Sequence, residues 1–196
     1  MTELELLTRI YAAVSRGEDL AGVIRLAAEG AKSLFSGHAA TVYFLENDKQ
    51  HLIPQNWSLP ESLTRKIEKL VGFGVRGLRL PVIEGGHYWR TIHERSAFLL
   101  ATPEEIAGLV GELAGDHPAL RKLIPAIARL LGYRSVLTAP LIAGNEIVGV
   151  IDVGSKVELG SEDLERFERL AIAMLRALAS RSNLSKSSLP SANLLP

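Results

Sequence analysis

One short stretch of the chain gathers most of the side chains that could bind a flat cofactor or a metal. His87, Tyr88, Trp89 and His93 lie within it. Aromatic rings stack on planar ligands, and an imidazole can serve as an axial ligand of haem iron. A six-residue spacing turns the two histidines to different faces of a helix, whereas a shared metal needs a spacing of three or four. The stretch therefore favours an aromatic helix packed under a sheet, with one haem-ligating histidine as the alternative.

Polar side chains within apolar strands are the second set of candidates. Asp152 interrupts the apolar run GVIDV, where strand alternation places it on the same face as Val150 and opposite Ile151. It is either a solvated residue of the sheet or a polar group in a pocket, because a buried carboxylate needs a partner or becomes neutral. Side chains of this kind can orient a ligand in a mostly apolar cavity. The candidate pocket residues are Tyr43, Asn56, Trp57, Arg76, His87, Tyr88, Trp89, His93, Thr138 and Asp152.

A glycine-rich motif is the third feature that could indicate a binding site. Residues 72–77 read GFGVRG and match the GxGxxG spacing of dinucleotide-binding loops. Such a loop must follow a strand and open a helix, whose N-terminus then meets the pyrophosphate. Here the pattern follows a predicted helix and precedes a predicted strand. It therefore indicates a helix end and a loop with positive φ angles.

Composition excludes several classes of chemistry. The chain has no cysteine, so it has no thiolate nucleophile, disulfide or cysteine-ligated metal. It also lacks Gly-x-Ser-x-Gly, Walker and His-Glu-x-x-His motifs, and we expect neither an enzyme nor a metal site. The 22 basic and 22 acidic residues cancel, which favours neither nucleic acid nor an anionic membrane as a partner. Without a signal peptide or a membrane-spanning run, a soluble cytoplasmic protein is expected.

The elements that must position these residues follow from periodicity and from helix-end signals. The first 36 residues predict two helices separated at Arg16 and Gly17, with Asp19 capping the second. Further helices are predicted from Pro60 to Gly72, at 87–94, 103–114 and 118–131, and from an N-cap at Ser161. Strands are predicted at 39–46, 51–57, 78–83, 97–100, 135–143 and 146–154. This order predicts an α+β fold, an antiparallel sheet of about six strands with helices on both faces.

Both terminal helices carry apolar residues at alternating steps of three and four, which is typical of a helix–helix seam. The two seams consist of Leu4, Leu7, Tyr11, Val14, Leu164, Phe167, Ala171, Met174 and Leu178. They either pack on each other within one chain or form a bundle between two chains. We expect the second arrangement and hence a homodimer, because short isolated seams need tertiary partners.

Two segments resemble a known family. Residues 139–153 (APLIAGNEIVGVIDV) are similar to the penultimate hairpin of GAF domains, and residues 159–164 (LGSEDL) with 170–171 (LA) are similar to that family's closing helix. The resemblance extends more weakly over about 4–181, and the block at 71–113 looks like GAF domains found beside histidine kinase modules. It implies a regulatory module that binds a small molecule between its sheet and the middle segment, with output through dimeric terminal helices.

The sequence departs from several branches of that family. Cyclic-nucleotide-binding members carry an Asn-Lys pair, a Phe and an Asp-Glu pair, which Ser155-Lys156, Leu159 and Glu162-Asp163 match only in part. Members that reduce free methionine sulfoxide need cysteines, and covalent bilin attachment commonly uses one. The absence of cysteine therefore argues against both activities.

These observations predict one sensory domain over residues 1–181, with terminal helices at 1–16 and 161–181 and a disordered tail at 182–196. Its small-molecule ligand and its cofactor, if it has one, are not identified by the sequence. A histidine kinase or another signalling domain is the expected output partner. The alternatives are a non-covalent haem or tetrapyrrole sensor and a ligand-free dimerisation module with a collapsed pocket.

Overall fold

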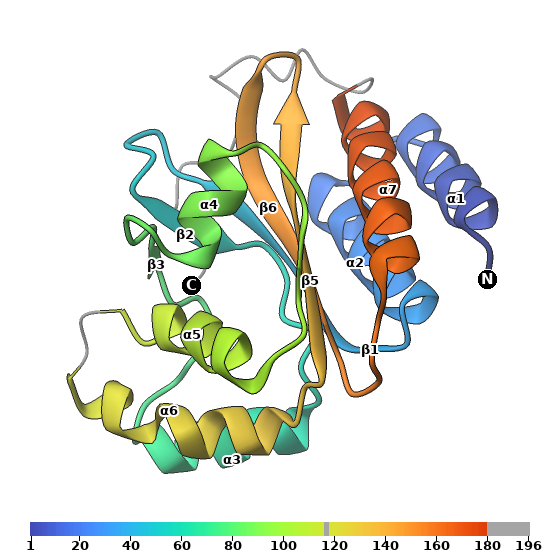
Figure 1. The fold of residues 1–196 in the computed structure, drawn as a ribbon. Coiled ribbons are helices and arrows are strands. Elements are labelled where there is room, and N and C mark those ends of the chain that lie inside the picture. The colour runs from blue at the N-terminus through green and yellow to red at the C-terminus, as the bar shows by residue number, and fades with distance from the viewer. Residues whose placement is uncertain (116–117, 180–196) are drawn as a thin grey trace.

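The computed structural model describes residues 1–115 and 118–179, whose arrangement is shown in Figure 1. The predicted tail at 182–196 and the last residues of the predicted closing helix lie outside the described residues. The helices are α1 (Glu3–Ser15), α2 (Leu20–Leu34), α3 (Glu61–Val71), α4 (His87–His93), α5 (Pro103–Leu113), α6 (Pro118–Leu131) and α7 (Ser161–Ala179). The strands are β1 (Gly37–Leu45), β2 (His51–Pro54), β3 (Leu80–Pro81), β4 (Phe98–Leu100), β5 (Ser135–Ala143) and β6 (Glu146–Ser155).

The six strands form one antiparallel sheet in the order β3-β2-β1-β6-β5-β4. Two hairpins, β1–β2 and β5–β6, are joined where β1 pairs with β6. Asp152 on β6 lies opposite Thr41 on one side and opposite Thr138 on the other. The predicted α+β fold with a six-stranded antiparallel sheet is confirmed, and Asp152 occupies one of its central strands.

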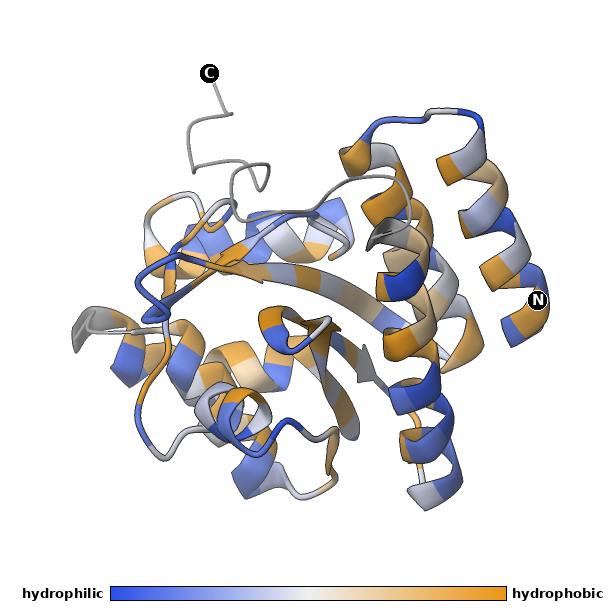
Figure 2. Cartoon of the chain, turned by 90° about the horizontal axis from the view of Figure 1, so that it is seen from above, coloured by the Kyte–Doolittle hydropathy of each residue, from blue (hydrophilic) through white to orange (hydrophobic). Residues whose placement is uncertain are grey.

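Helices cover both faces of the sheet, as the view from above in Figure 2 shows. On one face α1, α2 and α7 form a core with strand residues such as Val42, Leu137 and Ile151. The segment from α3 to α6 covers the other face. Because side chains alternate along a strand, Tyr43 and Asp152 point to this second face.

Local signals in the sequence explain where several helices begin and end. Asp19 caps α2 by accepting a hydrogen bond from the Gly22 amide at 2.7 Å, as predicted. Thr102 and Glu105 form a capping box at the start of α5. Gly72 ends α3 with a φ of 84°, a left-handed conformation that glycine adopts without a steric penalty.

Some predicted boundaries differ from the structure. Pro60 is the N-cap of α3 and not its first helical residue, and Ser161 is already helical in α7. The strand predicted at 51–57 ends at Pro54, and only Leu80 and Pro81 of the segment at 78–83 pair as a strand. Prolines at these positions cannot donate a hydrogen bond to a neighbouring strand, which limits the pairing.

The terminal helices pack against each other within one chain, which corrects the prediction for α7. Phe167, Ala171 and Met174 are buried in the core, and Phe167 packs edge-on against the Phe35 ring at 5.3 Å. They cannot line an interface between copies while this fold is intact. Leu164 also packs against this core, and the side chain of Leu178 lies outside the described residues.

The residues predicted for the α1 seam divide between two environments. Val14 is buried and Leu7 packs against the core, whereas Leu4 is 75% exposed and Tyr11 is 44% exposed. Leu6 and Ile10 of α1 also face the core, each one position before a predicted residue, Leu7 or Tyr11. Within the part of the chain that the structure describes, no helix has both the length and the apolar character needed to cross a bilayer.

Candidate functional site

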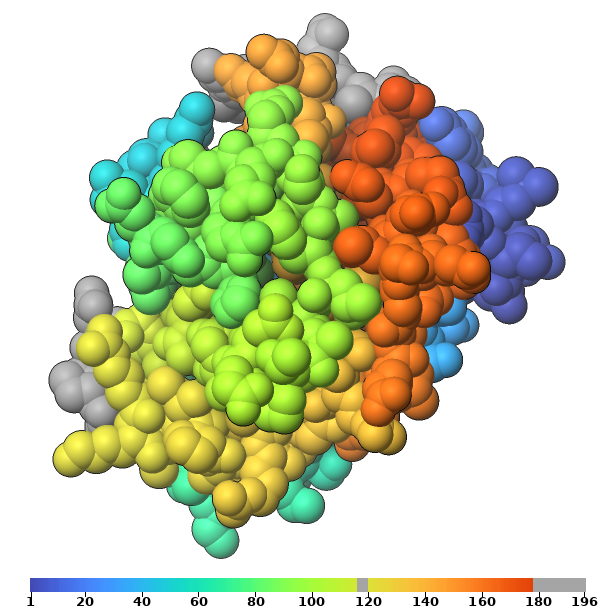
Figure 3. All heavy atoms as spheres, in the orientation of Figure 1, coloured from blue at the N-terminus to red at the C-terminus, as the bar shows by residue number. Residues whose placement is uncertain are grey.

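A largely apolar cavity of about 140 Å³ lies between the sheet and the segment from α3 to α6. Its walls include aliphatic side chains of α3, α5 and α6, such as Ile67, Leu109 and Ile127, and strand residues such as Val136. Figure 3 shows the covering elements, in green and yellow, closing over the front of the sheet. Mostly apolar clefts or cavities with a few polar groups are typical of small-molecule sites.

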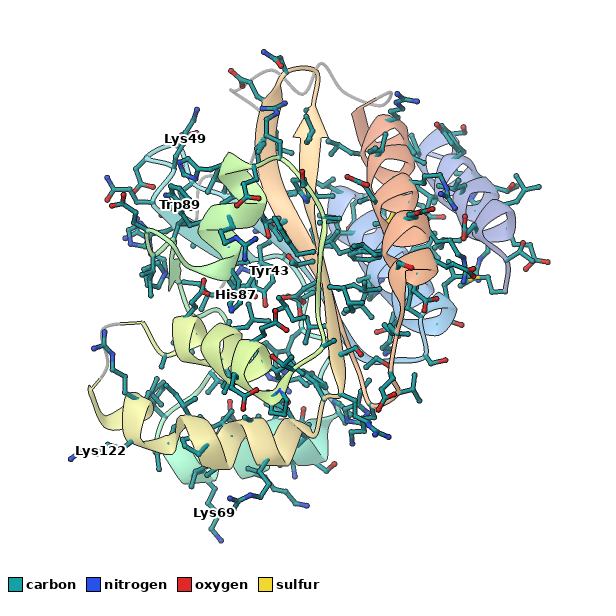
Figure 4. The ribbon with its side chains drawn as sticks, viewed as in Figure 1. Tyr43, Lys49, Lys69, His87, Trp89 and Lys122 are labelled. Carbon is teal, nitrogen blue, oxygen red and sulfur yellow. The ribbon has the colours of Figure 1, made fainter. Side chains whose placement is uncertain are left out.

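One polar group of the cavity is the Asp152 carboxyl on β6. The Tyr88 hydroxyl of α4 donates a hydrogen bond to its Oδ2 atom at 2.8 Å. Tyr43 on β1 contacts Tyr88 edge-on, with ring centroids 5.6 Å apart, and both rings are buried. Figure 4 shows Tyr43 pointing into the space between the sheet, α4 and α5. Three elements far apart in the sequence thus bring one carboxyl and two hydroxyls to the same cavity.

Burial sets the ionisation of this group. Desolvation raises the pKa of Asp152 to about 6, while hydrogen bonds to the carboxylate, from Tyr88 first, act in the opposite direction. Burial and the nearby Asp152 charge raise the pKa values of Tyr43, Tyr88 and Tyr133. The carboxyl therefore titrates much closer to neutral pH than an ordinary aspartate, beside phenols that stay neutral.

Four of the predicted pocket residues line this cavity: Tyr43, Trp57, Tyr88 and Asp152. Trp57 lines the cavity beside α3, where its Nε1 donates a hydrogen bond to the Thr64 hydroxyl at 2.8 Å. Thr138 lies on the same sheet face beside Asp152, but it is fully buried and does not line the cavity.

The other predicted pocket residues have different roles. Asn56 follows β2 and bonds the β1 backbone, accepting from the Val42 amide at 2.7 Å and donating to the Ala40 carbonyl at 2.8 Å. Its short polar side chain thus continues the strand pairing after the β2 backbone has turned away. Arg76 is exposed and forms an ion pair with Glu61. Neither side chain reaches the cavity.

The histidines of α4 do not contribute to the cavity, which corrects the haem alternative. His93 is exposed, and its ring stacks on the Trp89 ring with centroids 4.1 Å apart. His87 lies between α4 and α5, near Gly108, while Trp89 lies toward the periphery (Figure 4). A cavity of about 150 Å³ holds a molecule the size of benzene, so this one is far too small for a tetrapyrrole. The residues present do not fit haem or bilin.

Two residues of the site were missed by the sequence reasoning. Tyr133 precedes β5, and its ring lines the cavity against Gly154, where an added Cβ would come within 2.5 Å of ring atoms. A glycine in a strand often marks such a close approach, and this signal was available. Glu112 of α5 is buried and accepts hydrogen bonds from the backbone amides of His87 at 2.5 Å and Tyr88 at 3.2 Å. Burial raises its pKa.

A separate cluster of ligating atoms lies on the surface. Atoms of Glu46, Asp48 and His51 lie within 4.8 Å of one another. Arg79 forms ion pairs with both carboxylates, and His51 Nδ1 lies 3.2 Å from Asp48. A guanidinium thus already supplies the positive charge that a cation would bring to this cluster.

Comparisons with known proteins agree with this architecture. The model of the GAF domain family matches residues 19–184, and no curated protein matches the chain. The phycocyanobilin-bound GAF domain from a cyanobacterial phytochrome shares the fold with a TM-score of 0.63 and 16% identity, covering 92% of this chain and 96% of that chain. Residues 122 to 287 of a methyl-accepting chemotaxis protein give a TM-score of 0.61 at 18% identity, covering 90% of this chain and 96% of that chain.

A third similar structure is an enzyme, the free methionine-R-sulfoxide reductase from Neisseria meningitidis in complex with its substrate. Its TM-score is 0.60 at 15% identity, with 91% of this chain and 89% of that chain covered. At these identities the likeness shows a shared fold alone, whereas the family model spans most of the sequence. The predicted resemblance is therefore confirmed: the chain belongs to the GAF domain family.

Proposed function

We propose that this GAF domain senses a small molecule, which binds in the cavity between the sheet and the segment from α3 to α6. The observation that carries the proposal is the largely apolar, partly open cavity with the Asp152 carboxyl in its wall. A few convergent polar groups in an apolar wall can orient a ligand. The family membership supports a regulatory role, and the chain lacks cysteine for thiol chemistry.

Signal transmission would use the connection between β6 and α7. Asp152 lies on β6, which the short segment 156–160 connects to α7, and α7 packs along α1. A ligand that contacts Asp152 and Tyr88 differently in two states would shift the equilibrium between them. The readout would be a change in how the terminal helices are presented to a partner.

The partner surface is the exposed side of α1. Leu4 and Tyr11 are exposed there, and they support homodimerisation through α1 in place of the buried α7 residues. A histidine kinase or another signalling domain would receive the output. We infer a cytoplasmic protein, and the balanced charge supports partners that are neither nucleic acids nor membranes.

An NMR titration with benzene tests the binding site. Benzene is expected to shift the amide resonances of cavity-lining segments, because its size matches the cavity. A Val136→Phe variant, which fills the cavity from β5, is expected to remain folded and to lose these shifts. Wild-type spectra that do not change up to the aqueous solubility of benzene would contradict the proposal.

A further inference from the structure

The Asp152 carboxyl carries a charge that the protein does not compensate. Within residues 1–115 and 118–179, no lysine, arginine or histidine pairs with it. The titratable groups that face it are Tyr43 from β1, Tyr88 from α4 and Tyr133 from the turn before β5. All three are phenols, which stay neutral at neutral pH in these surroundings. Asp152 is half-buried in a largely apolar wall, where a negative charge is costly without a partner of opposite charge, so the site favours a cation.

Hydrogen-bonding capacity also remains on this carboxylate. A carboxylate has about four acceptor positions. The Tyr88 hydroxyl occupies one of them on Oδ2, and the Tyr43 hydroxyl and the Thr41 amide also bond the group. Since Asp152 lines the cavity, a donor on a bound molecule can reach the acceptor position that remains.

The rest of the wall restricts the body of the ligand. Around the carboxyl the cavity is lined by aliphatic and aromatic side chains, including Leu80, Ile106 and Leu109. A polar or multiply charged molecule would lose its hydration here without compensation. The volume of about 140 Å³ accommodates a body of about one six-membered ring.

We propose that the cavity selects small apolar molecules bearing one protonated amine, which pairs with the Asp152 carboxylate. This proposal rests on the ligand site proposed above. The amine would donate charge-assisted hydrogen bonds to Asp152, and the apolar body would fill the space under α5. Carboxylic acids of the same size would be rejected, because they would place a second negative charge beside Asp152. Neutral isosteres would bind more weakly, because they leave the carboxylate unpaired.

Three matched probes test this selectivity: benzylamine, benzyl alcohol and benzoate, titrated into wild-type protein by isothermal calorimetry at pH 7.5 and pH 5.0. At pH 7.5 benzylamine is expected to bind about tenfold or more tightly than benzyl alcohol, with benzoate weakest. Benzylamine affinity is expected to fall at pH 5.0 as Asp152 becomes protonated. Benzyl alcohol has no charge to pair and should change little between the two pH values.

An Asp152→Asn variant removes the charge while keeping a similar shape. Its preference for benzylamine over benzyl alcohol is expected to disappear, whereas Asp48→Asn, on the exposed β1–β2 turn, should keep the wild-type preference. Equal affinity for the two probes in wild-type protein, or an unchanged preference in Asp152→Asn, would overturn the amine assignment. Binding of benzyl alcohol without benzylamine would also overturn it while leaving the cavity site intact. If benzene and all three probes fail, the proposed function itself fails.

Discussion

Thr138 and Asp152 face each other across β5 and β6, yet their polar atoms differ in hydrogen bonding. The Tyr88 hydroxyl donates to Asp152, whereas the Thr138 hydroxyl is fully buried and has no hydrogen-bond partner among the described residues. A buried polar atom without a partner loses its hydration and gains nothing in return. This position therefore carries a cost in stability that a simple substitution can remove.

Thr138→Val is expected to raise the free energy of unfolding by about 1 kcal/mol, since it replaces the unpaired hydroxyl by a methyl group. Thr64→Val is the matched control. Thr64 is equally buried, but its hydroxyl accepts a hydrogen bond from Trp57, so this variant should lose about 1 to 3 kcal/mol. Urea denaturation measures both, and a destabilised Thr138→Val protein would show that the hydroxyl has a partner in solution.

The raised pKa of Asp152 predicts a pH-dependent stability. The folded protein binds this proton more tightly than the unfolded chain, whose aspartates titrate near 3.8. The stability that this tighter proton binding gives the folded protein is therefore complete below about pH 4 and is lost as the pH rises through about 6. Relative to Asp152→Asn, the wild-type free energy of unfolding should fall by about 3 kcal/mol between pH 4 and pH 7. If the free energies of unfolding of the two proteins changed with pH in the same way, the raised pKa of Asp152 would be contradicted.

Some residues of the cavity could be predicted from the sequence, and others could not. Alternation along strands placed Tyr43 and Asp152 on one face, because that period depends only on local backbone geometry. Glu112 was missed because it meets the site only through tertiary packing, whereas Gly154 signals a close approach without identifying Tyr133 as the neighbour. Asn56 was misassigned for the same reason, since its amide pairs with the backbone of another strand.

At the scale of elements, α4 is held by a neighbour and not by a cap of its own. Its N-terminal amides at His87 and Tyr88 donate to the Glu112 carboxylate of α5, and Gly86 at the N-cap offers no side chain. The helix that carries Tyr88 into the cavity is therefore fastened to the helix that forms another part of its wall. The predicted helix at 87–94 was correct in position, but nothing in its own residues indicated this attachment.

Glu112→Ala is expected to accelerate hydrogen exchange at the His87 and Tyr88 amides and to lower the free energy of unfolding by about 2 kcal/mol, because both donors lose their acceptor. Glu105→Ala provides the control, since Glu105 bonds the start of α5 and not α4. It should leave exchange at His87 and Tyr88 unchanged. Equal exchange in both variants would show that α4 is held by other contacts.

At the scale of the whole molecule, the order of elements could be predicted from the sequence, but the burial of the terminal helices could not. Apolar residues at alternating steps of three and four mark an apolar helix face, but they do not specify whether the partner helix belongs to the same chain. Phe167 and Met174 pack inside the chain, while Leu4 and Tyr11 remain exposed on α1. The proposed dimer must therefore use α1.

Replacing both Leu4 and Tyr11 by glutamate is expected to convert a wild-type dimer into a monomer in sedimentation velocity, because two like charges would meet across the interface. Ile83→Glu, at a similarly exposed apolar residue after β3, should leave the dimer intact. A wild-type protein that sediments as a monomer at high concentration would exclude the proposed assembly.

The pairing of β1 with β6 has a consequence for how the protein is made. The two strands come from the first and last quarters of the chain, so β1 leaves the ribosome long before its central partner has been translated. Contacts that close such long loops carry a large entropic cost and slow folding. Although β1 can pair with β2 early, its other edge stays unpaired during most of the synthesis and must be kept from aggregating. A transcript truncated before β6 is expected to yield insoluble product and not a smaller folded domain.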